Sequence, residues 1–281
     1  MTQYSGALEK MQVRADSENK VQYTLPIGEH RIGMNALIGR KITLTNLSQI
    51  NCIHCGIQTN KSYSQGFCFN CMRSLAQCDE CIMKPEQCHY AQGTCREPQW
   101  GEANCFNTHY VYLANTGQSK VGITRQIHGV VSSRWMDQGA TQAIVLYRVS
   151  NRLMSGLVET ACKSFISDKT NWRLMLKGEP EKLDLKALKN EMKDAIASQI
   201  QAIRNEYGLL AVQDIDHETV DIHYPVSQYP EKITSLNLDK ESSFTGTLKG
   251  IKGQYWMLDD NRVINIRKYT GYQATLLISD Q

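Results

Sequence analysis

The sequence lacks a marked net charge, a long apolar run and an N-terminal secretory signal. Its 31 basic and 28 acidic residues leave a formal charge of +3, which permits a nucleic-acid partner without requiring one. Because no segment has the length and apolarity of a membrane span, we expect no membrane partner. The absence of a signal pattern leads us to expect a cytoplasmic protein.

What the sequence has instead is a concentration of cysteine. Nine of its ten cysteines lie within residues 52–105, and the tenth, Cys162, lies alone in a helical pattern. Two thiolate pairs, each with a spacing of Cys-x-x-Cys, form the tetrahedral sites that hold structural Zn²⁺. The spacing therefore predicts a zinc ribbon whose ligands are Cys52, Cys55, Cys68 and Cys71.

A second zinc site is expected in the cysteines that follow. We assign it to Cys78, Cys81, Cys88 and Cys95, with Cys105 or His89 as the substitute ligand, because the spacing does not show which side chain folds back. A disulfide framework is an alternative, although the missing secretory signal disfavours it. An iron–sulfur cluster is another, since ligation by four cysteines does not by itself exclude iron.

The two ends of the chain resemble each other. Residues 4–8 (YSGAL) match residues 244–248 (FTGTL), and residues 39–44 (GRKITL) parallel residues 271–276 (GYQATL). Such patterns are typical of short strands. We expect the termini to pack together as one β-barrel or as paired small barrels. The alternative is chance similarity between glycine-rich strand ends.

The middle of the chain predicts a hairpin followed by two helices. Residues 109–113 and 120–124 have strand patterns on either side of the turn signal at 115–117. A helix carrying Arg134 and a strand at residues 143–147 are expected next. Asn151 is a plausible N-cap for the second helix, in which Glu159 lies beyond the edge of the buried face. We expect that buried face to consist of Leu153, Leu157, Ala161 and Phe165.

The later part of the chain is interpreted as scaffold. Apolar residues at intervals of three and four predict one long amphipathic helix over residues 183–207, ended by Gly208. Alternation over residues 219–224 predicts a strand whose acidic and histidine side chains face water. The expected organisation is α+β, with terminal β segments at 1–50 and 243–281, a zinc-binding region at 51–107, a central unit at 108–208 and a strand with linker at 209–242.

Residues 108–174 resemble the GIY-YIG nuclease superfamily in the order of their parts. Residues 110–112 (YVY) stand in the place of the first signature and residues 120–122 (KVG) in the place of the second. With the preceding cysteines and the runs GITR at 122–125 and NW at 171–172, the whole chain resembles a bacterial zinc-binding family, domain of unknown function 2797. The resemblance implies a three-stranded antiparallel sheet flanked by helices.

The resemblance also implies a metal-dependent phosphodiesterase site. Glu159 would hold Mg²⁺ or Mn²⁺, and Arg134 would clamp the scissile phosphate. Tyr112 would act as general base or position the attacking water, while Lys120 would lower the pKa of Tyr112 or contact phosphate. Asn171 matches the late asparagine that shapes the family's site.

Two departures from the nuclease signatures keep other functions open. Tyr110 replaces the first-signature glycine, and Lys120 replaces the second-signature tyrosine, so one of the two catalytic hydroxyls is missing. We expect a zinc-containing endonuclease that acts on DNA or RNA. The alternatives are a GIY-YIG-like module that binds nucleic acid without cleaving it and a zinc-dependent protein-interaction scaffold.

Overall fold

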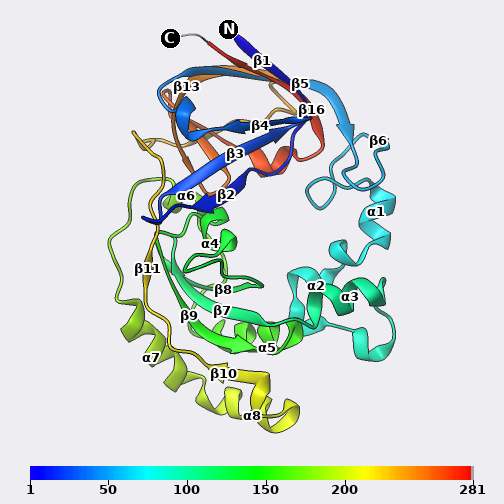
Figure 1. Ribbon diagram of the computed structural model, residues 1–281, viewed down its shortest axis with the longest axis vertical. Coiled ribbons are helices and arrows are strands. Elements are labelled where there is room, and N and C mark those ends of the chain that lie inside the picture. Colours follow the sequence, from blue (N-terminus) through cyan, green and yellow to red (C-terminus); the bar gives the residue numbers. More distant parts are fainter. Residues whose placement is uncertain (280–281) are drawn as a thin grey trace.

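The computed structural model describes residues 1–279 and has a mixed α+β fold, as the sequence predicts. Its named strands form three sheets, in which every described pair except β12–β15 is antiparallel. The large sheet lies at the top of Figure 1, and a central sheet with its helices lies below it. The cysteine-rich region forms an arm at the right that connects the two.

The two ends of the chain share the large sheet. Its strand order is β1 (Thr2–Ala7), β16 (Tyr272–Ile278), β5 (Lys41–Asn51), β13 (Ser243–Lys252), β14 (Tyr255–Leu258), β15 (Arg262–Asn265) and β12 (Thr234–Ser235), with β6 (Gln58–Thr59) beside β5. A small sheet of β2 (Gln12–Ala15), β3 (Val21–Ile27) and β4 (His30–Gly33) packs against it around a common apolar core. β1 and β12 are the end strands of this order, and the end of β1 also meets the end of β3, where Gly28 N donates to the Ala7 carbonyl oxygen at 2.9 Å and Leu8 forms a bridge with Ile27.

The matched sequence segments occupy equivalent places in the large sheet. Tyr4 in β1 lies opposite Leu276 in β16, and Phe244 in β13 lies opposite Leu44 in β5. Leu44 and Leu276 are themselves partners. Exchanging each matched segment for its counterpart gives the same strand pairing, so these four segments have an approximate two-fold arrangement in the sheet.

The central sheet contains the predicted hairpin of β7 (His109–Asn115) and β8 (Ser119–Thr124). Its strand order is β10 (Val212–Asp214), β9 (Gln142–Val149), β7 and β8, and β11 (Val220–Asp221) also pairs with β9. The sheet therefore has five strands rather than the expected three, because the segment after the last long helix returns to the outer edge of β9. Within the described residues, no named strand pairs with the outer edge of β8, where Val121 N donates to the Ser167 carbonyl oxygen at 2.9 Å.

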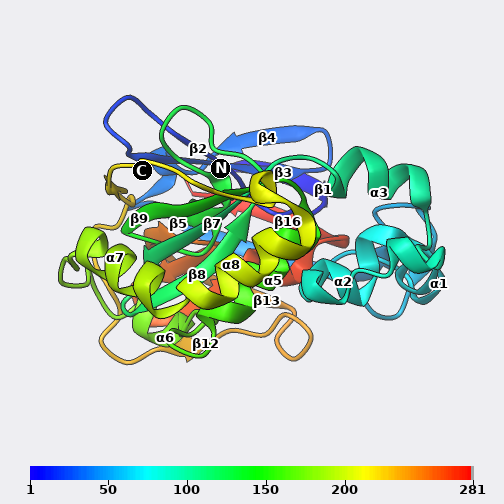
Figure 2. The same cartoon turned by 90° about the horizontal axis from the view of Figure 1, so that it is seen from below.

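Both faces of the central sheet are covered. Val111 and Leu113 in β7 face the helices α5 (Arg152–Cys162), α7 (Leu185–Ala195) and α8 (Ala197–Tyr207), which lie together on one side (Figure 2). The large sheet and the small sheet packed on it are together called the terminal β unit. Tyr112 and Ala114 alternate with Val111 and Leu113 and face the core that is shared with the terminal β unit and α4 (Ser133–Asp137). The alternation of side chains along β7 thus places Tyr112 in the interface between the central sheet and the terminal β unit.

Two helix predictions were wrong in detail. The expected helix over 183–207 is two helices, because the backbone turns at Ile196 (φ −108°, ψ 12°), which lets α7 pack on β9 and α8 pack on α5. In α5, Asn151 is the N-cap as expected, but the fully buried apolar residues are Met154, Val158 and Cys162, and Phe165 is 55% exposed. The buried face of α5 is rotated from the expected one because α5 packs on the cysteine-rich arm as well as on the sheet.

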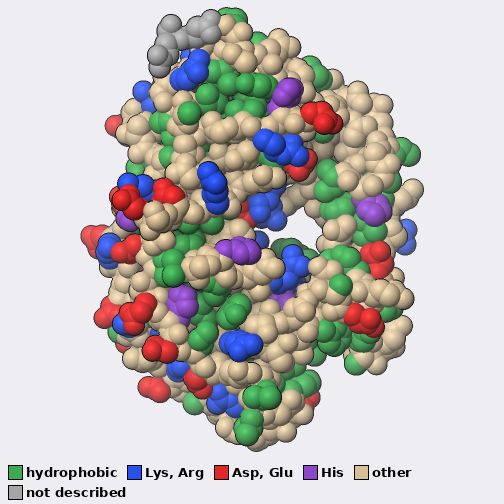
Figure 3. Space-filling model, viewed as in Figure 1, with side chains coloured by type: hydrophobic (Ala, Val, Ile, Leu, Met, Phe, Trp, Pro, Cys, Tyr) green, Lys and Arg blue, Asp and Glu red, His purple; other side chains and the backbone are tan. Residues whose placement is uncertain are grey.

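The arm closes onto the central unit through η3 (Pro85–Gln87). A Cβ at Gly156 in α5 would lie 2.3 Å from the Glu86 backbone nitrogen, so only glycine allows this approach. Along the same seam, Arg152 Nη2 donates to the Ile82 carbonyl oxygen at 2.5 Å. Because the arm also joins the large sheet through β5 and β6, the chain surrounds a central opening, which is visible in Figure 3.

Candidate functional site

Four sulfur atoms in the arm lie at the spacing of a metal site. The Sγ atoms of Cys52, Cys55, Cys68 and Cys71 all lie within 4.8 Å of one another. Gly56 and Gly66 have positive φ angles of 73° and 134°, which the two tight turns require. Burial raises the pKa of the Cys52 thiol, but backbone N–H groups outweigh this effect and bring it to about 6. Because Zn²⁺ binds thiolates in closed tetrahedral sites, the cluster is compatible with zinc.

The later cysteines meet around a separate small cavity, which is lined by Cys81, Cys88, Cys95 and Cys105 together with His89. Cys78, which the spacing assigned to this group, packs instead against the first cluster. Cys105 reaches the cavity because α3 (Pro98–Cys105) lies across it from α2 (Glu80–Met83). Asp79, Cys81 and His89 also bring ligand atoms within 4.8 Å of one another, although the Asp79 carboxylate already contacts Arg96 Nε at 2.8 Å.

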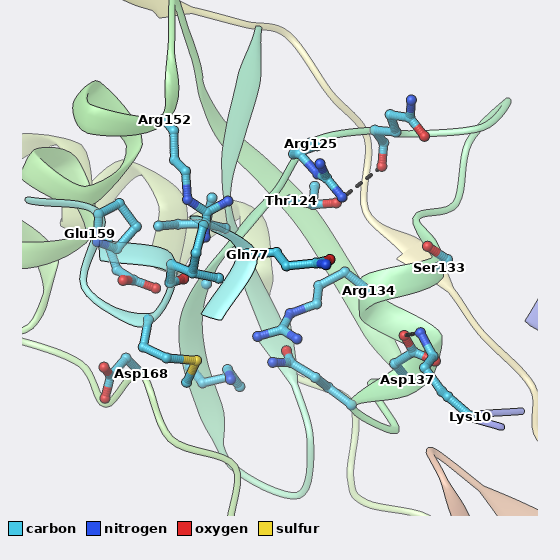
Figure 4. A pocket seen from close by; sticks show the side chains of 18 of the residues that line it. Lys10, Gln77, Thr124, Arg125, Ser133, Arg134, Asp137, Arg152, Glu159 and Asp168 are labelled. Atoms are coloured by element: carbon cyan, nitrogen blue, oxygen red, sulfur yellow. Dashed lines mark hydrogen bonds and ion pairs between the residues drawn. The ribbon is translucent and has the colours of Figure 1, made fainter. Parts of the chain in front are cut away.

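A larger cavity of about 470 Å³ lies along the outer edge of β8, between α4 and α5 (Figure 4). β8 contributes Lys120, α4 contributes Arg134 and α5 contributes Glu159, so three of the five predicted catalytic residues meet here. Burial raises the pKa of Glu159, and the neighbouring Lys163 opposes this shift. The cavity therefore brings a carboxylate and several cations into one place.

Cations outnumber acids in the wall of this cavity. It is lined by Lys10, Lys120, Arg125, Arg134, Arg152 and Arg267, against Asp137, Glu159 and Asp168. Lys10 is paired with Asp137, and Lys163 Nζ lies 3.5 Å from Glu159 Oε2 and 3.2 Å from Asp168 Oδ2. In the part of the chain that the structure describes, the other five lining cations have no carboxylate within 4.0 Å. A bound anion would relieve the repulsion among them.

Tyr112 lies behind the cavity rather than in its wall. Its side chain is fully buried, and a Cβ at Gly122, which does line the cavity, would lie 2.6 Å from its hydroxyl oxygen. Burial raises the pKa of Tyr112 to about 12, and the nearby Arg134 opposes this shift. The hydroxyl lies 2.6 Å from the Gln138 amide, whose oxygen, turned toward Arg134, accepts from Nε and Nη2 at 3.3 Å. Tyr112 thus meets the cavity through Gln138 and Arg134, which both line it.

Lys120 and Asn171 are placed differently from each other. Lys120 is buried at 2% exposure, lines the cavity and donates from Nζ to Thr170 Oγ1 at 3.2 Å. Burial and the nearby Arg134 lower its pKa to about 8, while Glu159 opposes this shift. Asn171 is exposed and lies outside the cavity, where its Oδ1 accepts from Leu174 N as the N-cap of α6 (Trp172–Met175).

Several lining residues, including Asp168, lie outside any sequence motif that pointed to the site. Lys10 precedes β2, Gln77 belongs to the arm, Arg152 begins α5, and Arg267 lies in η6 (Ile266–Tyr269). Arg267 is desolvated, which lowers its pKa, and the proximity of Arg134 lowers it further. No local pattern identifies these residues, because only the packing of the terminal β unit on the central unit brings Lys10 and Arg267 to Arg134.

The fold and the site define a class of mixed α+β proteins that combine a four-cysteine cluster with a cationic cavity. The family model described as "Protein of unknown function (DUF2797)" matches residues 39–274, and the chain belongs to that family. No curated protein and no solved structure matches the chain. None of the helices in residues 1–279 combines the length and apolarity needed to cross a membrane.

Proposed function

We propose that the protein is a zinc-containing phosphodiesterase that acts on nucleic acid with a site of the GIY-YIG type. The observation that carries this proposal is the group of five cavity cations without a carboxylate partner, next to Glu159. Lys and Arg side chains supply the sequence-independent part of nucleic-acid affinity by neutralising phosphates. Lys120, Arg134 and Glu159 come from the three elements that the superfamily resemblance assigned to the active face.

Glu159 and Asp168 are the oxygen donors that would hold Mg²⁺ or Mn²⁺. Their carboxylates fit this role because one ammonium group, Lys163 Nζ, already contacts both of them. A divalent ion in that position would stabilise the negative charge that grows on the leaving oxygen. Lys163 would then turn toward solvent, since a second cation between the two carboxylates would be repelled.

The other cavity residues have roles that follow from their positions. Arg134 and Arg267 bind the non-bridging oxygens of the phosphate, and Gln138 keeps the Arg134 guanidinium in place. Lys120 in its neutral form accepts the proton of the attacking water, whose oxygen bonds to phosphorus as the bond to the leaving oxygen breaks. We assign this proton transfer to Lys120 rather than to Tyr112 because only Lys120 lines the cavity. Tyr112 is a positioning residue that acts through Gln138.

We further propose that the arm holds two Zn²⁺ ions. The first is held by Cys52, Cys55, Cys68 and Cys71. The second is assigned to the cysteines around the small cavity, namely Cys81, Cys88, Cys95 and Cys105. Zinc supplies folding free energy in small cysteine-rich regions, which otherwise bury little apolar surface. The two ions would hold the arm rigid between the two β structures.

The decisive experiment is incubation of the purified protein with Mg²⁺ or Mn²⁺ and labelled DNA and RNA. We expect divalent-dependent cleavage that falls by about 100-fold or more in Glu159→Gln, because the amide keeps the shape and removes the charge. Glu191→Gln is the matched control, since Glu191 is an exposed glutamate on α7. Absence of divalent-dependent cleavage on single-stranded, duplex and branched substrates would refute the enzymatic part of the proposal.

One observation favours a second candidate function, nucleic-acid binding without cleavage. The hydroxyl of Tyr112 is buried with a pKa of about 12, and Lys120 stands in the place of the second-signature tyrosine. A protein with this function would bind nucleic acid in the same cavity, and Glu159→Gln would leave its affinity equal or raise it. Affinity and cleavage measured on the same substrates separate the two functions.

A further inference from the structure

The larger cavity beside Glu159 continues into a second one. The second cavity measures about 880 Å³ and shares Lys10, Gln77, Ser133 and Arg267 with the first. It extends along β2 and the turn of the first cysteine cluster, where Phe67 lines it. The lining residues of both cavities come from the parts of the chain that surround the central opening visible in Figure 3.

Three parts of the chain enclose this opening. The terminal β unit contributes Lys10 and Arg267, the arm contributes Gln77, and the central unit contributes Arg134. The arm is sealed to α5 by the close approach of Gly156 to η3. On the opposite side, Trp172 in α6 stacks on Tyr255 in β14, with ring centroids 5.4 Å apart and planes 7° apart. The walls therefore form a closed ring rather than a groove with one open side.

The size and chemistry of the opening select its occupant. Each of the two cavities lies within the range of about 300–1,000 Å³ that holds a drug-sized ligand, so together they have room for a few nucleotides of one strand. Arg125, Arg134 and Arg267, which have no carboxylate within 4.0 Å among the described residues, line the first cavity together with Trp100. A cationic channel with an aromatic side chain is the usual surface for single-stranded nucleic acid, because phosphates meet the cations and bases stack on the ring.

We infer that a single strand of nucleic acid passes through this opening, with one phosphate held between Arg134 and Arg267. Because the ring is closed, the strand enters by a free end. The inference rests on the nucleic-acid-binding part of the proposed function and not on cleavage. It assigns the substrate class as single-stranded nucleic acid with at least one accessible end.

Fluorescence anisotropy with the Glu159→Gln protein tests this inference without cleavage of the probe. The probes are a linear single strand, a blunt duplex of the same sequence, a covalently closed single-stranded circle, and the linear strand carrying biotin–streptavidin at both ends. We expect the linear strand to bind at least 10-fold more tightly than each of the other three. If the circle and the doubly blocked strand bind as tightly as the linear strand, threading is overturned. If the duplex binds more tightly than the linear strand, the substrate class is overturned.

A pair of arginine variants tests the path of the strand. Arg267→Gln is expected to weaken binding of the linear strand about 10-fold and to reduce the slope of log affinity against log salt by about 0.7, the contribution of one phosphate contact on a single strand. Arg14→Gln, at an exposed arginine of β2 outside both cavities, is the matched control and should leave affinity unchanged. An unchanged affinity and salt slope in Arg267→Gln would place the strand elsewhere and overturn the inference.

The outcomes separate this inference from the proposed enzymatic function. If the linear strand binds selectively but the wild-type protein with Mg²⁺ or Mn²⁺ cleaves nothing, the phosphodiesterase proposal fails and threading stands. If the wild-type protein cleaves circles and duplexes as fast as linear strands, threading fails and the phosphodiesterase proposal stands.

Discussion

Replacing Gly156 by alanine tests the contact that closes the ring. Gly156 lies inside α5, where alanine would normally stabilise the helix by about 1 kcal/mol. In this structure, however, the added Cβ would lie 2.3 Å from Glu86 N and 2.6 Å from Pro85 C. Both atoms belong to the backbone, so no flexible side chain can move aside.

We therefore expect Gly156→Ala to lower the free energy of unfolding, whereas helix propensity alone predicts that it rises. Overpacking a close contact costs about 1–3 kcal/mol, and subtracting the propensity gain leaves a net loss of about 1 kcal/mol. With a urea m value of about 3 kcal/mol/M, this loss lowers the unfolding midpoint by about 0.3 M. Hydrogen exchange in Pro85–Gln87 should also become faster, because relief of the clash moves η3 away from α5.

Gly33→Ala is the matched control for this measurement. Gly33 lies at the end of β4, has no positive φ, and a Cβ there would meet nothing within 4 Å. The free energy of unfolding of Gly33→Ala should differ from that of the wild-type protein by no more than about 0.5 kcal/mol. The reasoning is refuted if Gly156→Ala is as stable as the wild-type protein and exchange in Pro85–Gln87 is unchanged.

Three further predictions follow from the arm, the cavity and the large sheet. Elemental analysis should find about two Zn²⁺ per chain; Cys105→Ser should lose one equivalent and Cys78→Ser none, and the reverse pattern would restore the assignment made from spacing. Cleavage should rise with pH through about 8, the pKa of Lys120, because Lys120 accepts a proton only after losing its own; Lys120→Arg, which stays protonated, should abolish both the rise and the activity while retaining nucleic-acid affinity, and an unaltered pH profile would exclude this role. Deleting residues 243–281 should accelerate hydrogen exchange in β1 and β5, because β1 loses its partner β16 and β5 loses β13 and β16; unchanged exchange would mean that these strands are held independently.

The features that follow from local spacing were predictable. The first cysteine cluster needs only two tight turns that bring paired thiolates together, and its four sulfur atoms do converge. The hairpin of β7 and β8 depends on a turn signal between two strand patterns, and Asn151 caps α5 with its own side chain. Family membership was also recognisable, because the cysteine run and the later motifs occur in one fixed order.

Predictions from local patterns were wrong where the outcome depends on which elements pack together. Apolar spacing in residues 183–207 does not distinguish one long helix from two, since α7 and α8 have separate packing partners. Cysteine spacing likewise assigned Cys78 to the second group, whereas the packing of α3 beside α2 brings Cys105 there. Both outcomes depend on contacts between elements.

The sequence by itself determined which short segments form strands, turns and thiolate pairs, because those depend on residues a few positions apart. Only the tertiary structure decided that Tyr112 lies behind Gly122, while Lys120 lines the cavity beside Glu159. The same holds for Arg267, which reaches Arg134 from the other end of the chain. The physical reason is that the terminal β unit packs through β2 against α4, beside the outer edge of β8, and charged side chains from both parts of the chain meet there.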